Sequence, residues 1–340
     1  SGTGAFEGKG WVSRGFVGLE GERKGLMGFF DYPALTPESY AMIPSGAAWA
    51  SVFRFDGNRL ITDVRDAVVK INPETGQQFD QVMRQVYAFT GVDIQKDLFA
   101  SLGDTFEMYA TPEADGTIQR ITLVNRLKDA EKGEQALTSL EVFGNQMMQQ
   151  RGGNGVSFSQ EALDAPNDKV MAHLVTTPVG TGAWAVKDGV LYVSGGKTGI
   201  EQALKVAGKG LAADPKFIAL KAKLGQQDIG GFAYSDLNLV GPGYYNAMTS
   251  TIKQLTEMQG IQMADMPSFD LLKPYMGAGL SVWWTDAAGI HAAETGPFPG
   301  WSGINPMSEM QVRMQKAIMG EETPAAPAAP DAPATPPAGM

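Results

Sequence analysis

Segments with the period of a strand and segments with the period of a helix follow one another along this chain. Residues 48–55 are rich in strand formers and end at an Asp-Gly-Asn turn signal. An amphipathic helix comes next, because apolar residues recur three and four positions apart. They are Phe79, Val82, Met83, Val86 and Tyr87. Asp93 is placed to cap a further short helix that stops before Gly103, and strands over 106–110 and 117–125 then form a hairpin.

The same order of patterns returns in the second half of the chain. Residues 231–234 repeat the aromatic alternation of 52–55, and the helix, glycine and strand pattern of 98–109 has a counterpart in 271–283. Between these segments lies a second long helix with its own apolar positions. They are Tyr245, Met248, Ile252, Leu255 and Met258. The repetition predicts an internal duplication in which each copy contributes a strand, helices and a hairpin.

This order of elements predicts an α+β fold. We expect an internally duplicated, mainly antiparallel sheet, or two such sheets, with helices packed on one face. Each repeat is too long for a solenoid unit. The chain then divides into six segments. N-terminal strands over 1–35 are expected to continue an upstream region, and a first repeat over 36–150 follows them. After it come a strand-rich and helical connection over 151–229, a second repeat over 230–300, a closing helix over 301–320 and an Ala/Pro-rich disordered tail over 321–340.

The closing helix has a stripe of methionines. Met307, Met310, Met314 and Ile318 recur at helical spacing, and Gly320 follows them. Methionine fills irregular space in protein cores, so we expect this stripe to pack against the domain. The Ala/Pro composition of the tail cannot bury a core of its own.

Composition narrows the classes of function. The chain has 340 residues, of which 43% are hydrophobic and 19% charged, as in a globular protein. A net charge of -10 argues against a nucleic-acid partner, which needs a clustered basic surface. Cysteine is absent, which excludes disulfides and thiolate chemistry, and His173 and His291 are the only histidines. We therefore predict no metal and no cofactor, and no apolar run is long enough to predict a membrane span.

One predicted turn imitates two catalytic motifs. Residues 194–199 resemble a phosphate-binding loop between a strand and a helix, but Leu191 stands where the motif needs its first glycine. The same turn contains Ser-x-x-Lys and Lys-Thr-Gly, which lie far apart in penicillin-binding enzymes and overlap here. Ser1 as an N-terminal nucleophile would need a buried start, whereas glycines surround it. We predict no catalytic residue, and a serine hydrolase built on Ser1 or Ser194 is the least favoured hypothesis.

Aromatic side chains are the feature that indicates a ligand site. Trp283 and Trp284 are adjacent on a predicted strand, so their indoles point to opposite faces of the sheet. With Tyr244 and Trp301 they form a candidate platform for a glycan, a peptide or a lipid. The alternative is that helices or the other repeat cover both faces, and the indoles are then core residues.

A resemblance to a known family rests on two segments. Residues 91–98 (GVDIQKDL), continued by 102–104, and the lead 43–47 (IPSGA) before the first strand resemble a bacterial family of unknown function. Members of that family resemble secreted or envelope-associated proteins with duplicated strand–helix–helix–hairpin halves. The resemblance covers residues 35–300. It implies a location and a fold, and it brings no catalytic residue.

These observations favour a non-enzymatic bacterial envelope or extracellular protein with a structural or protein-interaction role. Its location would be secreted, periplasmic or at the cell surface, and its partner another envelope protein or a cell-wall glycan. The alternative function is a binding module for glycan, peptide or lipid that uses exposed aromatics. The oligomeric state stays open at this point.

Overall fold

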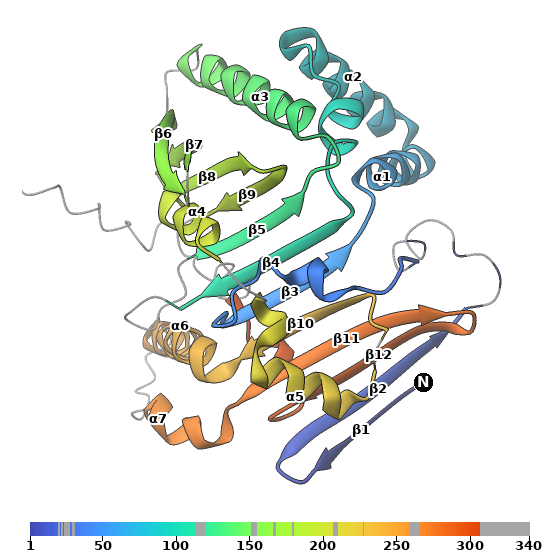
Figure 1. Cartoon of the computed structure of the whole chain (residues 1–340), viewed down its shortest axis with the longest axis vertical. Helices are drawn as coiled ribbons and strands as arrows, with labels where there is room; N and C mark the ends of the chain where they lie inside the picture. Colours follow the sequence, from blue (N-terminus) through green and yellow to red (C-terminus); the bar gives the residue numbers. More distant parts are fainter. Residues whose placement is uncertain are drawn as a thin grey trace, which may run out of the picture.

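One antiparallel sheet organises the structure. The computed structural model describes residues 1–306 except 20, 22, 24–27, 29–30, 113–119, 151–154, 166–167, 179, 207–209, 227 and 259–265. Within that part of the chain, twelve strands pair antiparallel in a single sheet (Figure 1). Their spatial order is β1 (Gly2–Glu7), β2 (Gly10–Gly18), β12 (Gly289–Gly296), β11 (Ala278–Asp286), β10 (Gly231–Asp236), β3 (Trp49–Arg54), β4 (Thr105–Thr111), β5 (Arg120–Arg126), β9 (Val190–Ser194), β8 (Gly180–Lys187), β7 (Asp168–Thr177) and β6 (Ser157–Ala165). The mainly antiparallel α+β fold is confirmed.

The helices form separate groups around this sheet. Figure 1 shows α1 (Gly57–Ile71), α2 (Pro73–Thr90) and α3 (Ala130–Gln150) together at one end of the molecule. The others are α4 (Lys197–Leu204), α5 (Pro215–Leu224), α6 (Leu237–Met258) and α7 (Phe269–Leu272). Short helical turns are η2 (Pro37–Tyr40), η3 (Ile94–Phe99), η4 (Gly210–Ala213), η5 (Lys273–Tyr275) and η6 (Trp301–Gly303). Among the helices described, none has the length and apolar character needed to cross a membrane. The predicted Met stripe of 307–318 lies outside the described residues.

Local capping signals set the starts of several helices. Asp93 accepts hydrogen bonds from the backbone N–H groups of Gln95 and Lys96, so the predicted cap is confirmed at the start of η3. Asp56 and Asp214 cap α1 and α5 in the same way. A cap of this kind satisfies backbone donors that the helix itself leaves unpaired and stabilises it by about 1 kcal/mol.

The two halves of the chain meet at the centre of the sheet. Strands β3 and β10 pair there, with Val52 opposite Phe232 and Ala50 opposite Tyr234. Each half follows its central strand with helices and a hairpin, β4–β5 in one half and β11–β12 in the other. The shared order agrees with the predicted pattern, whereas a duplication of the sequence stays a prediction. The N-terminal strands pair with β12 and form one edge of the sheet.

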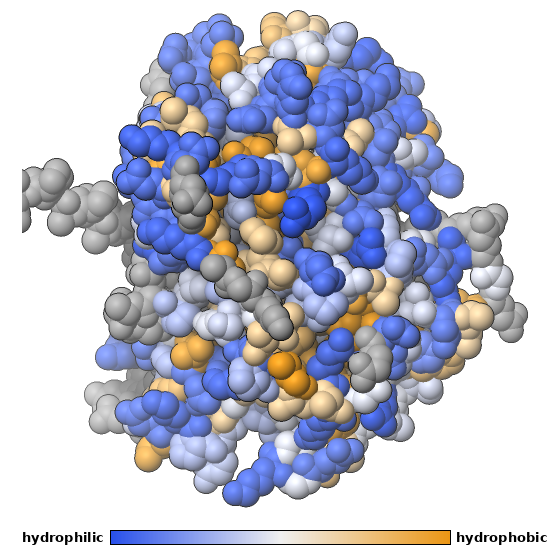
Figure 2. Space-filling view, in the orientation of Figure 1, coloured by the Kyte–Doolittle hydropathy of each residue, from blue (hydrophilic) through white to orange (hydrophobic). Residues whose placement is uncertain are grey.

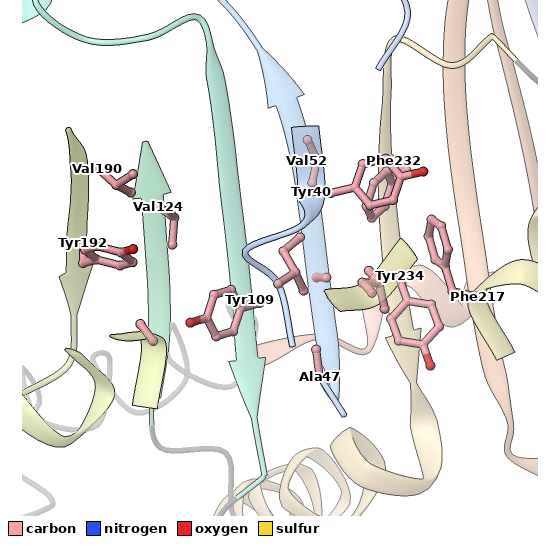
Figure 3. Packing of buried hydrophobic residues seen from close by; sticks show 14 of the residues in the cluster. Tyr40, Ala47, Val52, Tyr109, Val124, Val190, Tyr192, Phe217, Phe232 and Tyr234 are labelled. Atoms are coloured by element: carbon pink, nitrogen blue, oxygen red, sulfur yellow. The ribbon is translucent and has the colours of Figure 1, made fainter. Parts of the chain in front are cut away.

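The larger hydrophobic core lies on one face of the sheet. We call this face, which carries Ala50, Val52 and Phe232, the core face. Helices α4 and α5 cover it with Ile200 and Phe217, and both side chains are almost completely buried. Figure 3 shows aromatic and aliphatic side chains meeting along the central strands. Each fully buried side chain of this size contributes about 1.5–3 kcal/mol. Hydrophilic residues dominate the outer surface seen in Figure 2.

Helices also pack on the opposite face, which we call the back face. Trp49 and Ala110 point there, because side chains alternate along each strand, and they pack against Val240 of α6. The prediction that helices cover one face is therefore wrong. Its physical reason is that strands such as β3 carry apolar residues at successive positions, which places apolar surface on both faces of the sheet.

One carboxylic acid lies inside the core. Glu107 of β4 is 8% exposed, and its Oε2 has no hydrogen-bond partner among the described residues. The hydroxyls of Tyr109 and Tyr192 point toward one another close to it (Figure 3). Burial raises the pKa of Glu107 to about 8, and the Met42 backbone and the charge of Arg126 offset only part of this shift. Glu107 therefore stays protonated at neutral pH.

We predict that the free energy of unfolding falls as the pH rises from 4.5 to about 8. The unfolded chain titrates Glu107 at its ordinary pKa of 4.5, while the folded protein keeps the proton up to about 8. Below both values the stabilisation of the neutral acid is complete, and above both it is lost. Each pH unit between them lowers the stability by about 1.4 kcal/mol, or roughly 5 kcal/mol in total. Urea unfolding from about pH 4 to about pH 9 measures this slope.

Two variants isolate the contribution of this one group. Glu107→Gln does not ionise, so its stability relative to the native chain should rise steadily over the same pH range. Glu7→Gln makes the same exchange at a side chain that is exposed in the folded protein, and it is the matched control for the substitution itself. Parallel stability curves for the native chain and Glu107→Gln would contradict the prediction.

Candidate functional site

The two adjacent tryptophans of β11 lie on opposite faces of the sheet. Trp284 is half-buried on the core face, where its ring stacks on His291 with centroids 5.0 Å apart. His291 packs in turn on Phe16 at 4.7 Å. Trp283 is half-buried on the back face against Gly231, where a Cβ would fall 2.0 Å from the indole. The two indoles therefore do not form one platform.

Trp301 is a core residue, which corrects its prediction as a ligand-binding side chain. It is 1% exposed, because η6 folds its indole onto two glycines of the back face. A Cβ at Gly279 or Gly296 would fall 2.6 Å or 2.3 Å from the ring. Tyr244 lies half-buried on α6, and in the described part of the chain no ring contact joins it to a tryptophan. The structure thus does not gather the four predicted residues.

A groove of about 550 Å³ opens instead on the back face, over β1, β2, β12 and β11. Small residues line its floor, since Gly15 lies opposite Ala292 and Ser281 follows on β11. Ala292 is exposed although β12 is an interior strand of the sheet. Trp11 and residues 2–4 line one side. This part of the back face is therefore open, and no described helix covers it.

One polar cluster lies in the groove. Ser13 Oγ donates a hydrogen bond to Glu294 Oε1 at 2.9 Å. Ser281 lies opposite Glu294 in the strand register, so hydroxyl groups flank the carboxylate on both sides. Among the described residues, Glu294 Oε2 has no hydrogen-bond partner. A half-buried carboxylate with neighbouring hydroxyls can accept hydrogen bonds from the donors of a ligand.

Trp11 supplies the apolar side of the groove. Its ring contacts Phe6 edge-on, with centroids 5.3 Å apart and the planes at 72°. It also covers Gly4, where a Cβ would lie 2.4 Å from the ring. Phe6 is 60% exposed, so this aromatic pair lies at the accessible edge of the sheet. An indole beside hydrogen-bonding oxygens suits ligands that have both apolar and hydroxyl-bearing faces.

The sequence indicated Trp283 and missed Trp11 and Glu294. Ser13 and Glu294 are 281 positions apart, and no local pattern indicates that β2 pairs with β12. The available signal was the alternation of Trp11, Ser13 and Gly15, which places one large and two small residues on the same face of a strand.

The turn that resembles catalytic motifs is held by structural contacts. Ser194 is 4% exposed, and its hydroxyl pairs with that of Thr122 at 3.0 Å. Lys197 Nζ lies 2.6 Å from a carboxylate oxygen of Glu161. Both side chains are therefore engaged within the fold, and the N-terminal amine of Ser1 likewise donates to a backbone oxygen at 2.8 Å.

The two histidines lie on different strands, and each has a carboxylate partner. His173 Nδ1 is 2.8 Å from Glu141 Oε2, and His291 Nε2 is 3.0 Å from Asp286 Oδ2. Within the residues that the structure describes, no group of three or more His, Asp or Glu side chains is placed to hold a metal ion.

Comparison of the chain with protein-family models, with curated proteins and with solved structures found no match. The resemblance of residues 91–104 to an envelope family stays a prediction. The groove and its side chains are therefore the features of this chain that indicate a function.

The burial of Trp301 leads to a stability prediction. Trp301→Ala removes a fully buried indole from its glycine-lined position, so we expect it to lower the free energy of unfolding by about 3–5 kcal/mol. Tyr275→Ala is the control, because Tyr275 is 75% exposed and its loss should change stability by less than about 0.5 kcal/mol. Urea unfolding measures both, and equal effects of the two substitutions would show that Trp301 is not core.

Proposed function

We propose that this protein binds a hydroxyl-rich ligand, such as a glycan, in the groove between Trp11 and Glu294. The observation that carries the proposal is the open groove on the back face, where an indole, hydroxyls and a carboxylate meet around the exposed Ala292. An antiparallel sheet can leave one face to solvent, but a groove in which an aromatic ring and a few polar groups converge is typical of a ligand site.

The residues of the groove suit the chemistry of a sugar ring. A sugar presents C–H groups on its faces and hydroxyl groups around its rim. The Trp11 indole offers an apolar surface for the former, and Glu294 Oε2 and Ser281 offer hydrogen-bonding oxygens for the latter. The small floor residues Gly15 and Ala292 let a flat ring approach the strands closely.

A location in the bacterial envelope or outside the cell belongs to the same proposal. Its support is the absence of cysteine, the low charged fraction of 19% and the resemblance of residues 91–104. In that location the groove would meet cell-wall glycans. Binding without catalysis is the role that we propose for the site.

We predict that Trp11→Ala and Glu294→Gln each weaken glycan binding by about tenfold to a hundredfold. The first substitution removes the apolar wall, and the second removes the negative charge while keeping the size of the side chain. Co-sedimentation with insoluble cell-wall glycan and calorimetric titration with its soluble fragments measure the affinity.

The matched control for Trp11 is Trp284→Phe, which changes an indole on the core face, outside the groove. It should bind like the native chain. Circular dichroism and urea unfolding confirm that each variant is folded. If the native chain shows no glycan binding, or if Trp11→Ala binds as well as Trp284→Phe, the groove is not a glycan site.

A further inference from the structure

The helices α1, α2 and α3 keep their large apolar side chains half-buried or exposed. The buried residues of α1 and α2 are Gly57 and Gly76, and those of α3 are Gly133 and Ala136. These small residues mark close backbone contacts, whereas no large side chain of the three helices is fully buried. An amphipathic helix of this length normally gains most of its stability by burying an apolar face.

Large apolar side chains are exposed where α2 and α3 adjoin. Val82 and Phe89 of α2 are 54% and 72% exposed, and Val142 of α3 is 51% exposed. Phe89 stacks on Phe143 with centroids 5.6 Å apart and the planes at 20°, which joins the two helices at this point. We call the surface formed by these four residues the α2–α3 surface. Exposed aliphatic and aromatic residues that cluster in this way mark interaction sites.

Uncharged polar residues surround the α2–α3 surface. Gln78 and Gln85 lie one turn before and after Val82 on α2, and Gln146 follows Val142 one turn later on α3. Residues 142–150 include no charged side chain, in a chain whose net charge is -10. Asp80 of α2 points to the other side of its helix, where it pairs with Arg65 of α1. The surface is thus neutral as well as apolar.

We infer that the α2–α3 surface binds the same surface of a second copy of this chain. Two copies with the same negative charge repel each other, and they can approach most closely where the surface is neutral. A two-fold interface must be complementary to itself, and glutamine amides meet this condition because each one both donates and accepts. A charged partner would instead find no complementary charge here. Helices α2 and α3 of both copies would then form a four-helix contact.

The test is sedimentation velocity of the full chain from about 1 µM to about 1 mM, the range of weak self-association. We expect a monomer–dimer equilibrium, and Phe89→Ser should weaken it at least about tenfold. Phe89 is mostly exposed, so the variant should fold normally. Leu271→Ser is the matched control, since Leu271 of α7 is 65% exposed and lies outside the α2–α3 surface. It should dimerise like the native chain.

A charge pair separates self-association from binding to another protein. Val82→Lys and Val82→Glu should each be monomeric alone, and an equimolar mixture of the two should recover dimers. A native chain that stays monomeric over the whole concentration range overturns the inference. So does a dimer that survives in both Phe89→Ser and Val82→Lys, because the interface would then lie elsewhere. These outcomes are independent of glycan binding in the groove.

Discussion

The antiparallel pairing of β3 with β10 is the contact on which the rest of the structure depends. It sets Val52 opposite Phe232 and Ala50 opposite Tyr234, so residues from both halves of the chain share the core face. A slip of one position would move these side chains to the opposite face. The rings of Phe232 and Tyr234 also contact Phe217, which fixes α5 over the junction of the two halves. The register of this one strand pair thus determines which side chains form the core and which side chains lie on the back face.

The back face is covered unevenly as a consequence. In the middle of the sheet, Val240 of α6 packs against Trp49. Toward the β6 edge, α3 lies against the strands, and its Glu141 contacts His173 of β7. Around Ala292 of β12 no described helix lies on the back face, and Ala292 stays exposed. The candidate groove is therefore the part of the back face that the described residues leave uncovered.

Helix caps and the alternation of side chains along a strand could be predicted from the sequence, whereas the pairing of distant strands could not. The cap at Asp93 and the alternation of Trp283 and Trp284 depend on neighbours a few positions away, and both agree with the structure. The pairing of Ser13 with Glu294 joins opposite ends of the chain, so no window of sequence contains it. Likewise, apolar periodicity predicts α2 as a helix without saying whether its apolar face is buried. Both proposed binding surfaces, the groove and the α2–α3 surface, depend on such long-range contacts or burial and could not be predicted from the sequence.

The position that Trp301 fills can be compared with the open groove beside it. Its indole lies on Gly279 and Gly296, and in the strand register Gly296 is opposite Trp11. Two positions further along the same strands come Ser281 and Glu294, which line the open groove. The first position is filled by an indole of the chain itself, whereas the second has hydroxyls and a carboxylate in place of a covering side chain. Polar groups at the floor of an open groove are a poor fit for an indole and a good one for a sugar.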